Sequence, residues 1–263
     1  MGEVIVVTSG KGGVGKTTTT ANLGTGLAQK GKLVVMIDTD IGLRNLDVVL
    51  GLENRIVYDL VDVVRGNCKL KQALIKDKRF ENMYLLPAAQ TKDKTAVNQK
   101  QMINLTQTLK QEFDYVIIDC PAGIEHGFKN AIAGADKAIV VSTPEVSAVR
   151  DADRIIGLLE SANLYCPKLI VNRIRPKMVQ AGDMMSVDDM LEILAVELLG
   201  IVPDDDSIVT STNRGEPAVL DEHSRAGEAY RNITDRILGE EIEFLDLTDT
   251  PGFFQRIKYW FAK

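Results

Sequence analysis

The chain has 263 residues, of which 45% are hydrophobic and 26% are charged, which is enough for one compact domain with a large core. The formal net charge is −6, so the field of the whole molecule does not attract nucleic acid. The three cysteines have no paired spacing, which argues against a disulfide framework or a zinc site and fits a reducing cytosol. We expect no signal peptide and no membrane-spanning helix, because the first apolar run lacks a basic segment before it and no apolar run is long enough.

Apolar runs alternate with helix-like segments along most of the chain. The expected strands, in chain order, are 4–7, 33–37, 83–86, 115–119, 137–142, 167–172 and 200–202. The expected helices are 17–30, 53–66, 69–76, 99–112, 146–161, 187–199 and 224–238, and a loop is expected at 41–51. This alternation is typical of βαβ units, so we expect the α/β class, a doubly wound and mostly parallel sheet with helices on both faces.

A glycine-rich loop connects the first expected strand to the first expected helix. It reads GKGGVGKTT from Gly10 to Thr18 and satisfies the phosphate-loop pattern G-x-x-x-x-G-K-[ST] in the strand–loop–helix context that this pattern requires. Its glycines let backbone N–H groups converge on phosphate oxygens at the start of a helix. Lys16 is expected to reach the β- and γ-phosphates, and the Thr17 hydroxyl to hold Mg²⁺. The expected nucleotide contacts are Lys11, Gly12, Gly13, Val14, Gly15, Lys16, Thr17 and Thr18.

Two other interpretations of the loop are possible. Gly10, Gly12 and Gly15 also spell G-x-G-x-x-G, the fingerprint of dinucleotide binding, with Asp38 as a candidate ribose-binding acid. A dinucleotide loop has no use for Lys-Thr after its last glycine, and Asp119 ends a later strand as a Walker B carboxylate would. A plain turn between strand and helix is the other interpretation, and the combined match of residues and context argues against it.

Acidic residues follow two of the expected strands, at the edge of the sheet where ligands bind. Asp119 is expected to orient a magnesium-bound water, whereas Asp38 and Asp40 lie where a carboxylate could polarise an attacking water. Each of these acids could instead cap a helix or hold a loop. Phosphoryl transfer needs positioning and charge neutralisation more than covalent chemistry, and Lys16, Thr17 with Mg²⁺ and the loop amides are expected to supply most of both.

The composition changes after Gly239. We expect an ATPase domain at 1–239, an acidic linker at 240–251 and an amphipathic helix at 252–263. At 100° per residue the bulky side chains of this last segment fall within one arc of about 120°, with basic residues beside it. The apolar residues are Phe253, Phe254, Ile257, Trp260 and Phe261, and the basic ones are Arg256, Lys258 and Lys263. This composition predicts a helix that lies on an anionic phospholipid membrane without spanning it, and the alternative is a helix that packs back on the domain.

One such tail is expected to bind weakly. Each basic residue near an anionic surface contributes about 1 kcal/mol, and ordering the helix offsets part of the apolar gain. Two tails on one dimer gain roughly 10²–10⁴ in avidity. Dimerisation would therefore switch membrane binding without any change in the tail.

The loop resembles the deviant Walker A motif of the MinD/ParA family of ATPases, because a second lysine, Lys11, stands at its start. The stretches 38–47, 119–124, 150–154, 171–173 and the tail also match, so the resemblance covers nearly the whole chain. It implies a P-loop NTPase fold of the SIMIBI type with ATP and Mg²⁺ as cofactors. It implies that Lys11 reaches the partner subunit's nucleotide and acts in catalysis with Lys16 and Asp40. Asp40 would position the water, and Asp38 would lie near the metal.

The resemblance also implies two surfaces that residue types alone do not establish. The adenine would contact Asn172 and Arg173, with Pro203 and Asp204 as a second wall, although an Asn at a strand end is often a turn former. The partner-binding surface would include Arg44, Glu53, Asp151 and Asp153.

For function, the resemblance implies an ATP-bound homodimer on the cytoplasmic face of the cell membrane. It would recruit the division inhibitor MinC, which blocks FtsZ ring assembly away from midcell, and a MinE-type activator or a polar scaffold would control it. The alternatives are a ParA-type partitioning ATPase, which needs a basic DNA-binding surface, a flagellar-number regulator, and a non-catalytic scaffold. No specific nucleic acid is expected, and the scattered cysteines oppose a nitrogenase-type iron–sulfur subunit.

Overall fold

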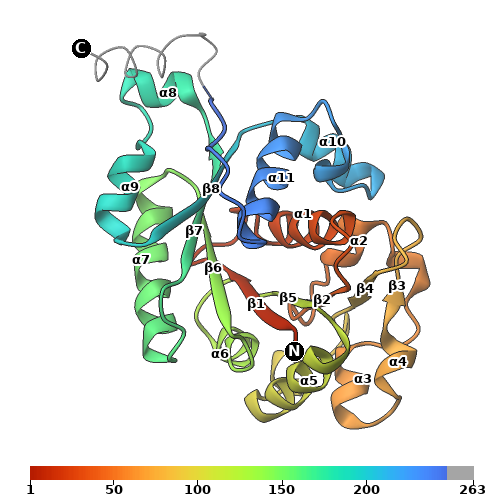
Figure 1. Ribbon diagram of the computed structural model, residues 1–263. Coiled ribbons are helices and arrows are strands. Elements are labelled where there is room, and N and C mark those ends of the chain that lie inside the picture. Colours follow the sequence, from red (N-terminus) through yellow and green to blue (C-terminus); the bar gives the residue numbers. More distant parts are fainter. Residues whose placement is uncertain (248–263) are drawn as a thin grey trace.

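An eight-stranded sheet organises the computed structural model, which describes residues 1–247 (Figure 1). The strands are β1 (Glu3–Thr8), β2 (Val34–Asp38), β3 (Ile75–Lys76), β4 (Met83–Leu86), β5 (Tyr115–Asp119), β6 (Lys137–Ser142), β7 (Lys168–Ile174) and β8 (Glu197–Pro203). Their order is β3-β4-β2-β5-β1-β6-β7-β8, and every neighbouring pair is parallel except β3 and β4. The expected mostly parallel sheet is confirmed, whereas the expected tail helix at 252–263 lies outside the described residues.

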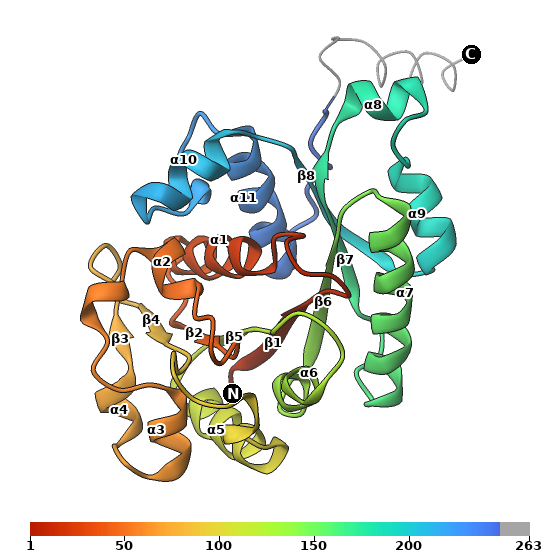
Figure 2. The same cartoon turned by 180° about the vertical axis from the view of Figure 1, so that it is seen from behind.

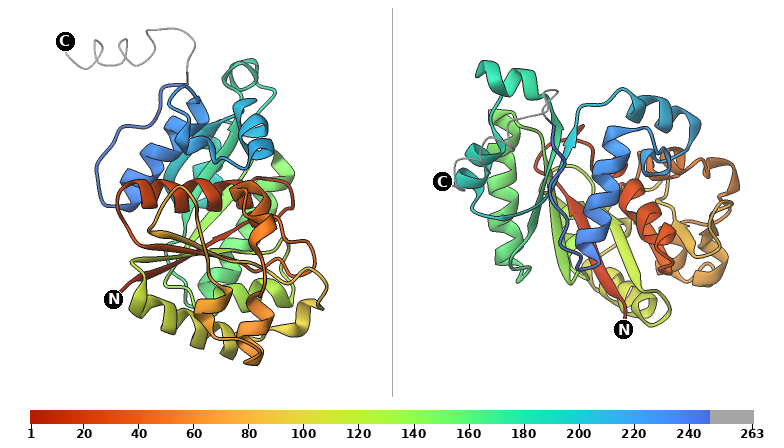
Figure 3. Two further views of the ribbon diagram at one scale, coloured as in Figure 1. Left: turned by 90° about the vertical axis from the view of Figure 1, so that its right-hand side faces the viewer. Right: turned by 45° about the horizontal axis from the view of Figure 1, so that its top comes forward.

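Helices cover both faces of the sheet (Figures 1 and 2). One layer comprises α1 (Lys16–Gln29), α2 (Leu46–Leu50), α10 (Ser207–Arg214) and α11 (Arg225–Ile237). The other comprises α3 (Leu60–Arg65), α4 (Leu70–Ala73), α5 (Gln99–Glu112), α6 (His126–Ile132), α7 (Val146–Ser161) and α9 (Val187–Leu194), and α8 (Pro176–Ala181) follows β7. In the left view of Figure 3 the sheet lies between these two layers.

The core consists of two apolar clusters, one on each face of the sheet. In β1, Val4 and Val6 belong to the cluster under α5 and α7, whereas Ile5 and Val7 belong to the cluster under α1 and α11. Successive side chains of a strand point to opposite faces, so a strand that is covered on both sides is apolar throughout. This explains the continuous apolar runs in the sequence.

The structure differs from the expected helices at 53–66 and 69–76. The first is broken into a 3₁₀ turn at Glu53–Arg55 and helix α3, because the Asp59 side chain accepts hydrogen bonds from the backbone N–H groups of Val61 and Asp62 and begins a new helix. In the second, α4 ends at Ala73, and β3 then pairs antiparallel with β4. Local capping and sheet pairing both prevail over the helical pattern here.

The expected helix at 187–199 is also too long. Helix α9 ends at Leu194, Ala195 has a left-handed φ of 50°, and β8 begins at Glu197 to pair with β7. The segment 41–51, expected as a loop, contains the five-residue helix α2, and three further helices of six to eight residues, α6, α8 and α10, were not expected. Helices this short contain too few turns for a clear apolar period.

Candidate nucleotide site

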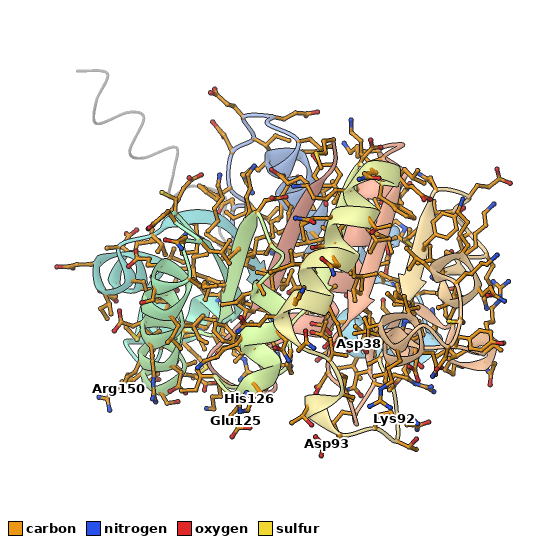
Figure 4. All side chains as sticks on the ribbon, turned by 90° about the horizontal axis from the view of Figure 1, so that it is seen from below. Asp38, Lys92, Asp93, Glu125, His126 and Arg150 are labelled. Carbon is orange, nitrogen blue, oxygen red and sulfur yellow. The ribbon has the colours of Figure 1, made fainter. Side chains whose placement is uncertain are left out.

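The candidate site lies where the carboxyl ends of β1, β2 and β5 meet. The strand register places Asp38 opposite Asp119 and Asp119 opposite Val7, three residues before the first glycine of the loop. Exposed polar residues from the segments after other strands lie along one edge of the molecule. Figure 4 labels them together with Asp38: Lys92 and Asp93 in the loop after β4, Glu125 and His126 at the start of α6, and Arg150 in α7. The acids, the glycine-rich loop and these exposed polar residues therefore lie at the same edge of the sheet.

Close contacts on both sides of the loop require glycine. Gly15 precedes α1 with a φ of 103°, and a Cβ atom on it would lie 2.3 Å from Nδ2 of Asn172. Gly10 packs on α7, where a Cβ atom would lie 2.4 Å from the backbone of Asp151. The loop is thus held between β7 and α7, two elements more than 130 residues away in the chain.

The two lysines of the loop are oriented differently. Lys16 is buried, and its Nζ donates a hydrogen bond of 2.9 Å to Oγ of Ser9, which itself donates to the Lys11 carbonyl oxygen at 2.8 Å. Lys11 is half-exposed and lies at the start of α7, where its Nζ is 3.2 Å from Oγ of Ser147 and 3.6 Å from Oε2 of Glu145. The sequence analysis did not identify Ser9, Glu145 and Ser147 as partners of the two lysines. The one signal in the local sequence was the hydroxyl of Ser9, directly before the first glycine of the loop.

Asp119 is buried beside the loop and α1. Thr20 donates a hydrogen bond of 3.3 Å to its Oδ1, and the Thr17 hydroxyl also bonds to this carboxyl group. Burial, and then the negative charge of Asp38, raise the pKa of Asp119 to about 8, although Thr17 and Lys16 oppose the shift. A cation beside Thr17 would offset the electrostatic cost of ionising Asp119.

Asp38 organises the segment that leads to α2. Its carboxylate accepts hydrogen bonds from the backbone N–H groups of Asp40 (2.9 Å), Asn45 (3.1 Å) and Leu46 (3.2 Å). Burial raises the pKa of Asp38 to about 6, because these three bonds offset only part of the desolvation. Asp38 therefore sets the position of Asp40, and the predicted place of Asp38 near the metal remains a prediction.

Asp40 itself is partly buried and lines a cavity of about 20 Å³ beside Pro121 and Asn130. Within residues 1–247 no three Asp, Glu, His or Cys side chains converge to hold a metal ion. Mg²⁺ that binds with a nucleotide needs few protein ligands, since phosphate oxygens and water complete its shell. The Thr17 hydroxyl and the Asp119 carboxylate fit this kind of site.

The expected base-binding residues lie beside the loop, at the ends of β7 and β8. Asn172 is buried, and its Nδ2 donates a hydrogen bond of 2.7 Å to the Val14 carbonyl oxygen, while its Oδ1 accepts from the N–H of Arg173. Arg173 has a left-handed φ of 58°, at a point where the pairing of β7 with β8 is irregular. Asn172 thus supports the loop in this structure, and its adenine contact remains a prediction.

Pro203 and Asp204 line an open cleft of about 780 Å³. Arg175, which follows β7, donates a hydrogen bond of 2.6 Å from Nε to Oδ2 of Asp204, which follows β8, so this ion pair joins the ends of the two strands within the lining of the cleft. Arg173 lines a neighbouring cleft of about 610 Å³ beside Glu145.

The expected partner-surface residues differ in how accessible they are. Glu53 and Asp153 are exposed, whereas Asp151 is partly buried. The Arg44 side chain is only 19% exposed, because its Nε lies 2.9 Å from Oδ2 of the fully buried Asp47. A partner could therefore reach Glu53 and Asp153 directly. Arg44, by contrast, is paired with Asp47 and stabilises the segment between β2 and α2.

The fold and the loop together define the class of this protein, a P-loop ATPase with a second lysine at the start of its phosphate loop. The family model described as an AAA domain matches residues 2–169. The septum site-determining protein MinD of Bacillus subtilis is 63% identical over 265 residues, which cover 100% of this chain and 99% of that protein. The chain belongs to the family of septum site-determining MinD proteins.

Solved structures of relatives have the same fold. A chain of the MinC:MinD cell division protein complex of Aquifex aeolicus is 51% identical with a TM-score of 0.86, covering 92% of this chain and 98% of that one. The septum site-determining protein MinD of Pyrococcus horikoshii, complexed with Mg-ADP, is 30% identical with a TM-score of 0.83, covering 92% of this chain and 100% of that one. None of the helices described between residues 1 and 247 is long and apolar enough to cross a membrane.

Proposed function

We propose that the chain is a Mg²⁺-dependent ATPase that binds ATP at Gly10–Thr18. The observation that carries this proposal is the geometry around the start of α1. The buried Lys16 ammonium lies beside Ser9 at the base of the loop, and Thr20 of α1 donates a hydrogen bond to the buried Asp119 carboxylate at the end of β5. The Pyrococcus horikoshii relative was solved with Mg-ADP, which supports the same ligand class here. Mg²⁺ would neutralise charge between the β- and γ-phosphates.

The residues of the chain then have distinct tasks. The loop amides and Lys16 hold the phosphates, and Asp40, positioned through Asp38, orients the attacking water. Lys11 lies at the surface, where only the exposed Ser147 and Glu145 of the described residues contact its ammonium, so it could exchange these contacts for the nucleotide of a second subunit. Hydrolysis would then depend on dimerisation. An arginine finger in other P-loop enzymes has the same electrostatic role.

At the level of the cell, we propose that the ATP-bound dimer attaches to the cytoplasmic face of the membrane through 252–263 and recruits MinC in division-site selection. The Aquifex aeolicus relative was solved in a MinC:MinD complex. The exposed Glu53 and Asp153 are accessible to such a partner. A MinE-type activator or a polar scaffold would act on the same dimer. The net charge of −6 opposes the alternative of DNA binding by a partitioning ATPase.

The test combines ATP turnover with co-sedimentation on anionic vesicles for the parent, Lys11→Ala and Lys71→Ala. Lys71 is a matched control, because it is an exposed lysine on α4, in the helix layer that covers the other face of the sheet from α1. We expect the parent to sediment with ATP but not with ADP, Lys11→Ala to lose at least about tenfold in turnover, and Lys71→Ala to behave like the parent. Turnover and dimerisation of Lys11→Ala at the parent level would refute the role in trans.

A further inference from the structure

The hydroxyl group of Thr20 in α1 has a different partner from several other hydroxyl groups in the helices. Those of Thr108, Ser161 and Thr234 each donate to the carbonyl oxygen of the residue four positions earlier in their own helix. This bond is common for a helical Ser or Thr, because that carbonyl oxygen lies within reach of the side chain. The Thr20 hydroxyl instead donates to Oδ1 of Asp119 at 3.3 Å and thereby joins α1 to β5. A hydroxyl has one proton to donate, so this bond takes the place of the intrahelical one.

Thr20 lies one turn after the residues that are expected to hold phosphate and metal. Lys16 and Thr17 precede it by four and three positions, so the three side chains lie on the same side of α1. Helical side chains tilt toward the N-terminus of their helix, which directs the Thr20 hydroxyl toward the first turn. Thr20 is fully buried and Asp119 is 2% exposed, so bulk water does not compete for their hydrogen bond.

The backbone of Asp119 is held independently of Thr20. Within the sheet, Asp119 lies between Val7 of β1 and Asp38 of β2. Its carbonyl oxygen accepts hydrogen bonds from the N–H (3.1 Å) and from the hydroxyl (2.6 Å) of Thr39. These contacts fix the main chain but not the plane of the carboxylate, because the last torsion of an Asp side chain has only broad, two-fold preferences. The bond from Thr20 to Oδ1 therefore selects one orientation of that plane.

We propose that Thr20 is a positioning residue for the metal: its hydroxyl holds the Asp119 carboxylate in the orientation that serves Mg²⁺ beside Thr17. This inference rests on the proposed Mg²⁺-dependent binding of ATP and extends it to a residue beyond the phosphate-loop pattern, which ends at Thr17. Hydrogen bonds that orient the carboxylates of metal sites are typically worth roughly 10–100-fold in metal affinity. Because Mg²⁺ and the nucleotide bind together, a weaker metal site reduces the gain in nucleotide affinity that Mg²⁺ provides.

The first test is calorimetric titration of the full chain with ADP, once in saturating Mg²⁺ and once in a chelator that removes it. The ratio of the two Kd values measures how much the metal strengthens nucleotide binding. We expect Thr20→Val to lower this ratio about tenfold and to leave binding in the chelator unchanged. Thr20→Ser, which keeps the hydroxyl, should stay within about threefold of the parent. Thr25→Val is the matched control on the same helix and should equal the parent, because the buried Thr25 hydroxyl bonds to no described residue.

This comparison separates positioning of the metal site from a merely structural contact. A structural contact would weaken ADP binding with and without Mg²⁺ alike, and that result, or an unchanged ratio in Thr20→Val, would overturn the proposal. An equal loss in Thr20→Ser would also overturn it, since the hydroxyl would then be irrelevant. A parent whose ADP binding did not respond to Mg²⁺ would refute the proposed Mg²⁺ site itself.

The second test asks whether Thr20 acts through Asp119. The same ratio is measured for Asp119→Asn and for the double variant that also carries Thr20→Val. We expect Asp119→Asn to lower the ratio and the second substitution to change it by less than about twofold, because the carboxylate that Thr20 orients is already absent. A further tenfold fall in the double variant, or an unchanged ratio in Asp119→Asn, would contradict action through this carboxylate.

Discussion

Ser9 links the two lysines of the phosphate loop, and only its contacts in the structure reveal this role. It lies before the loop, is almost fully buried, and its hydroxyl joins Lys16 to the backbone of Lys11. Removing it would leave a buried ammonium without this acceptor, which costs more than losing an exposed hydrogen bond.

We predict that Ser9→Ala lowers the free energy of unfolding of the nucleotide-free protein by about 1–3 kcal/mol. Saturating Mg-ADP should restore most of the loss, since phosphate oxygens then accept from Lys16. Urea denaturation with and without ADP measures both effects. Thr25→Val is the matched control, because the buried Thr25 hydroxyl has no hydrogen-bond partner, and it should cost little. A loss in Ser9→Ala that ADP leaves unchanged would argue against the contact.

The acids of the site predict a pH dependence. Burial and the charge of Asp38 raise the pKa of Asp119 to about 8, above its value in the unfolded chain. The folded state then binds more protons than the unfolded state at intermediate pH, so stability falls as the pH rises toward 8. The slope from this group is at most about 1.4 kcal/mol per pH unit.

We predict that Asp119→Asn removes this slope and is more stable than the parent at pH 9 in the absence of nucleotide and Mg²⁺. Urea denaturation of both proteins from pH 5 to pH 9 measures it. Parallel curves for the parent and the variant would show that Asp119 is ionised in the folded state throughout, contrary to its buried position.

At the scale of elements, one arginine holds together two short helices of the α1 layer. Arg79, between β3 and β4, donates to the carbonyl oxygens of Leu50 and Gly215, at the ends of α2 and α10, and pairs with the buried Asp77. Gly51 and Gly215 stack so closely that a Cβ on Gly215 would lie 2.5 Å from the Gly51 Cα atom. Because Asp38 holds the beginning of α2 and Arg79 holds its end, the segment with Asp40 is fixed from both sides.

Arg79→Lys should therefore lower the free energy of unfolding by about 2 kcal/mol, because an ammonium cannot form the planar fork and leaves carbonyl oxygens unpaired. Arg65→Lys, at an exposed position on α3, should change it by less than about 0.5 kcal/mol. Chemical denaturation of both variants provides the comparison. Similar small effects in the two would mean that Arg79 is replaceable as an anchor.

At the scale of the whole molecule, we expect the two tails of a dimer to attach it to the membrane together. Deleting 252–263 should abolish binding to anionic vesicles and leave ATP binding intact, because the phosphate loop and the expected tail occupy different parts of the chain. Vesicle co-sedimentation with ATP, and calorimetric titration of ATP as the control, measure the two properties. Vesicle binding by the truncated protein would instead place the membrane-binding surface on the ATPase domain.

The sequence predicted most of the sheet and the longest helices. The expected ranges for β5, β6, α5 and α7 coincide with the observed elements, because these segments are long or strongly periodic and are bounded by clear capping or turn residues. Short elements were missed or merged. A helix of one or two turns depends on caps such as Asp38 and Asp59, which act through hydrogen bonds that periodicity does not detect.

By itself, the sequence determined the phosphate loop, the two lysines, the acids after the strands and the mostly parallel sheet. These features depend on contiguous residues, whose spacing is set by the geometry of the backbone. Only the tertiary structure decided that Asn172 supports Val14 and that Arg236 joins the segment 240–247 to β8. It also decided that Leu247 lines the same cleft as Pro203 and Asp204. Such contacts join residues far apart in the chain, and they follow from the order in which the strands assemble, which no local pattern specifies.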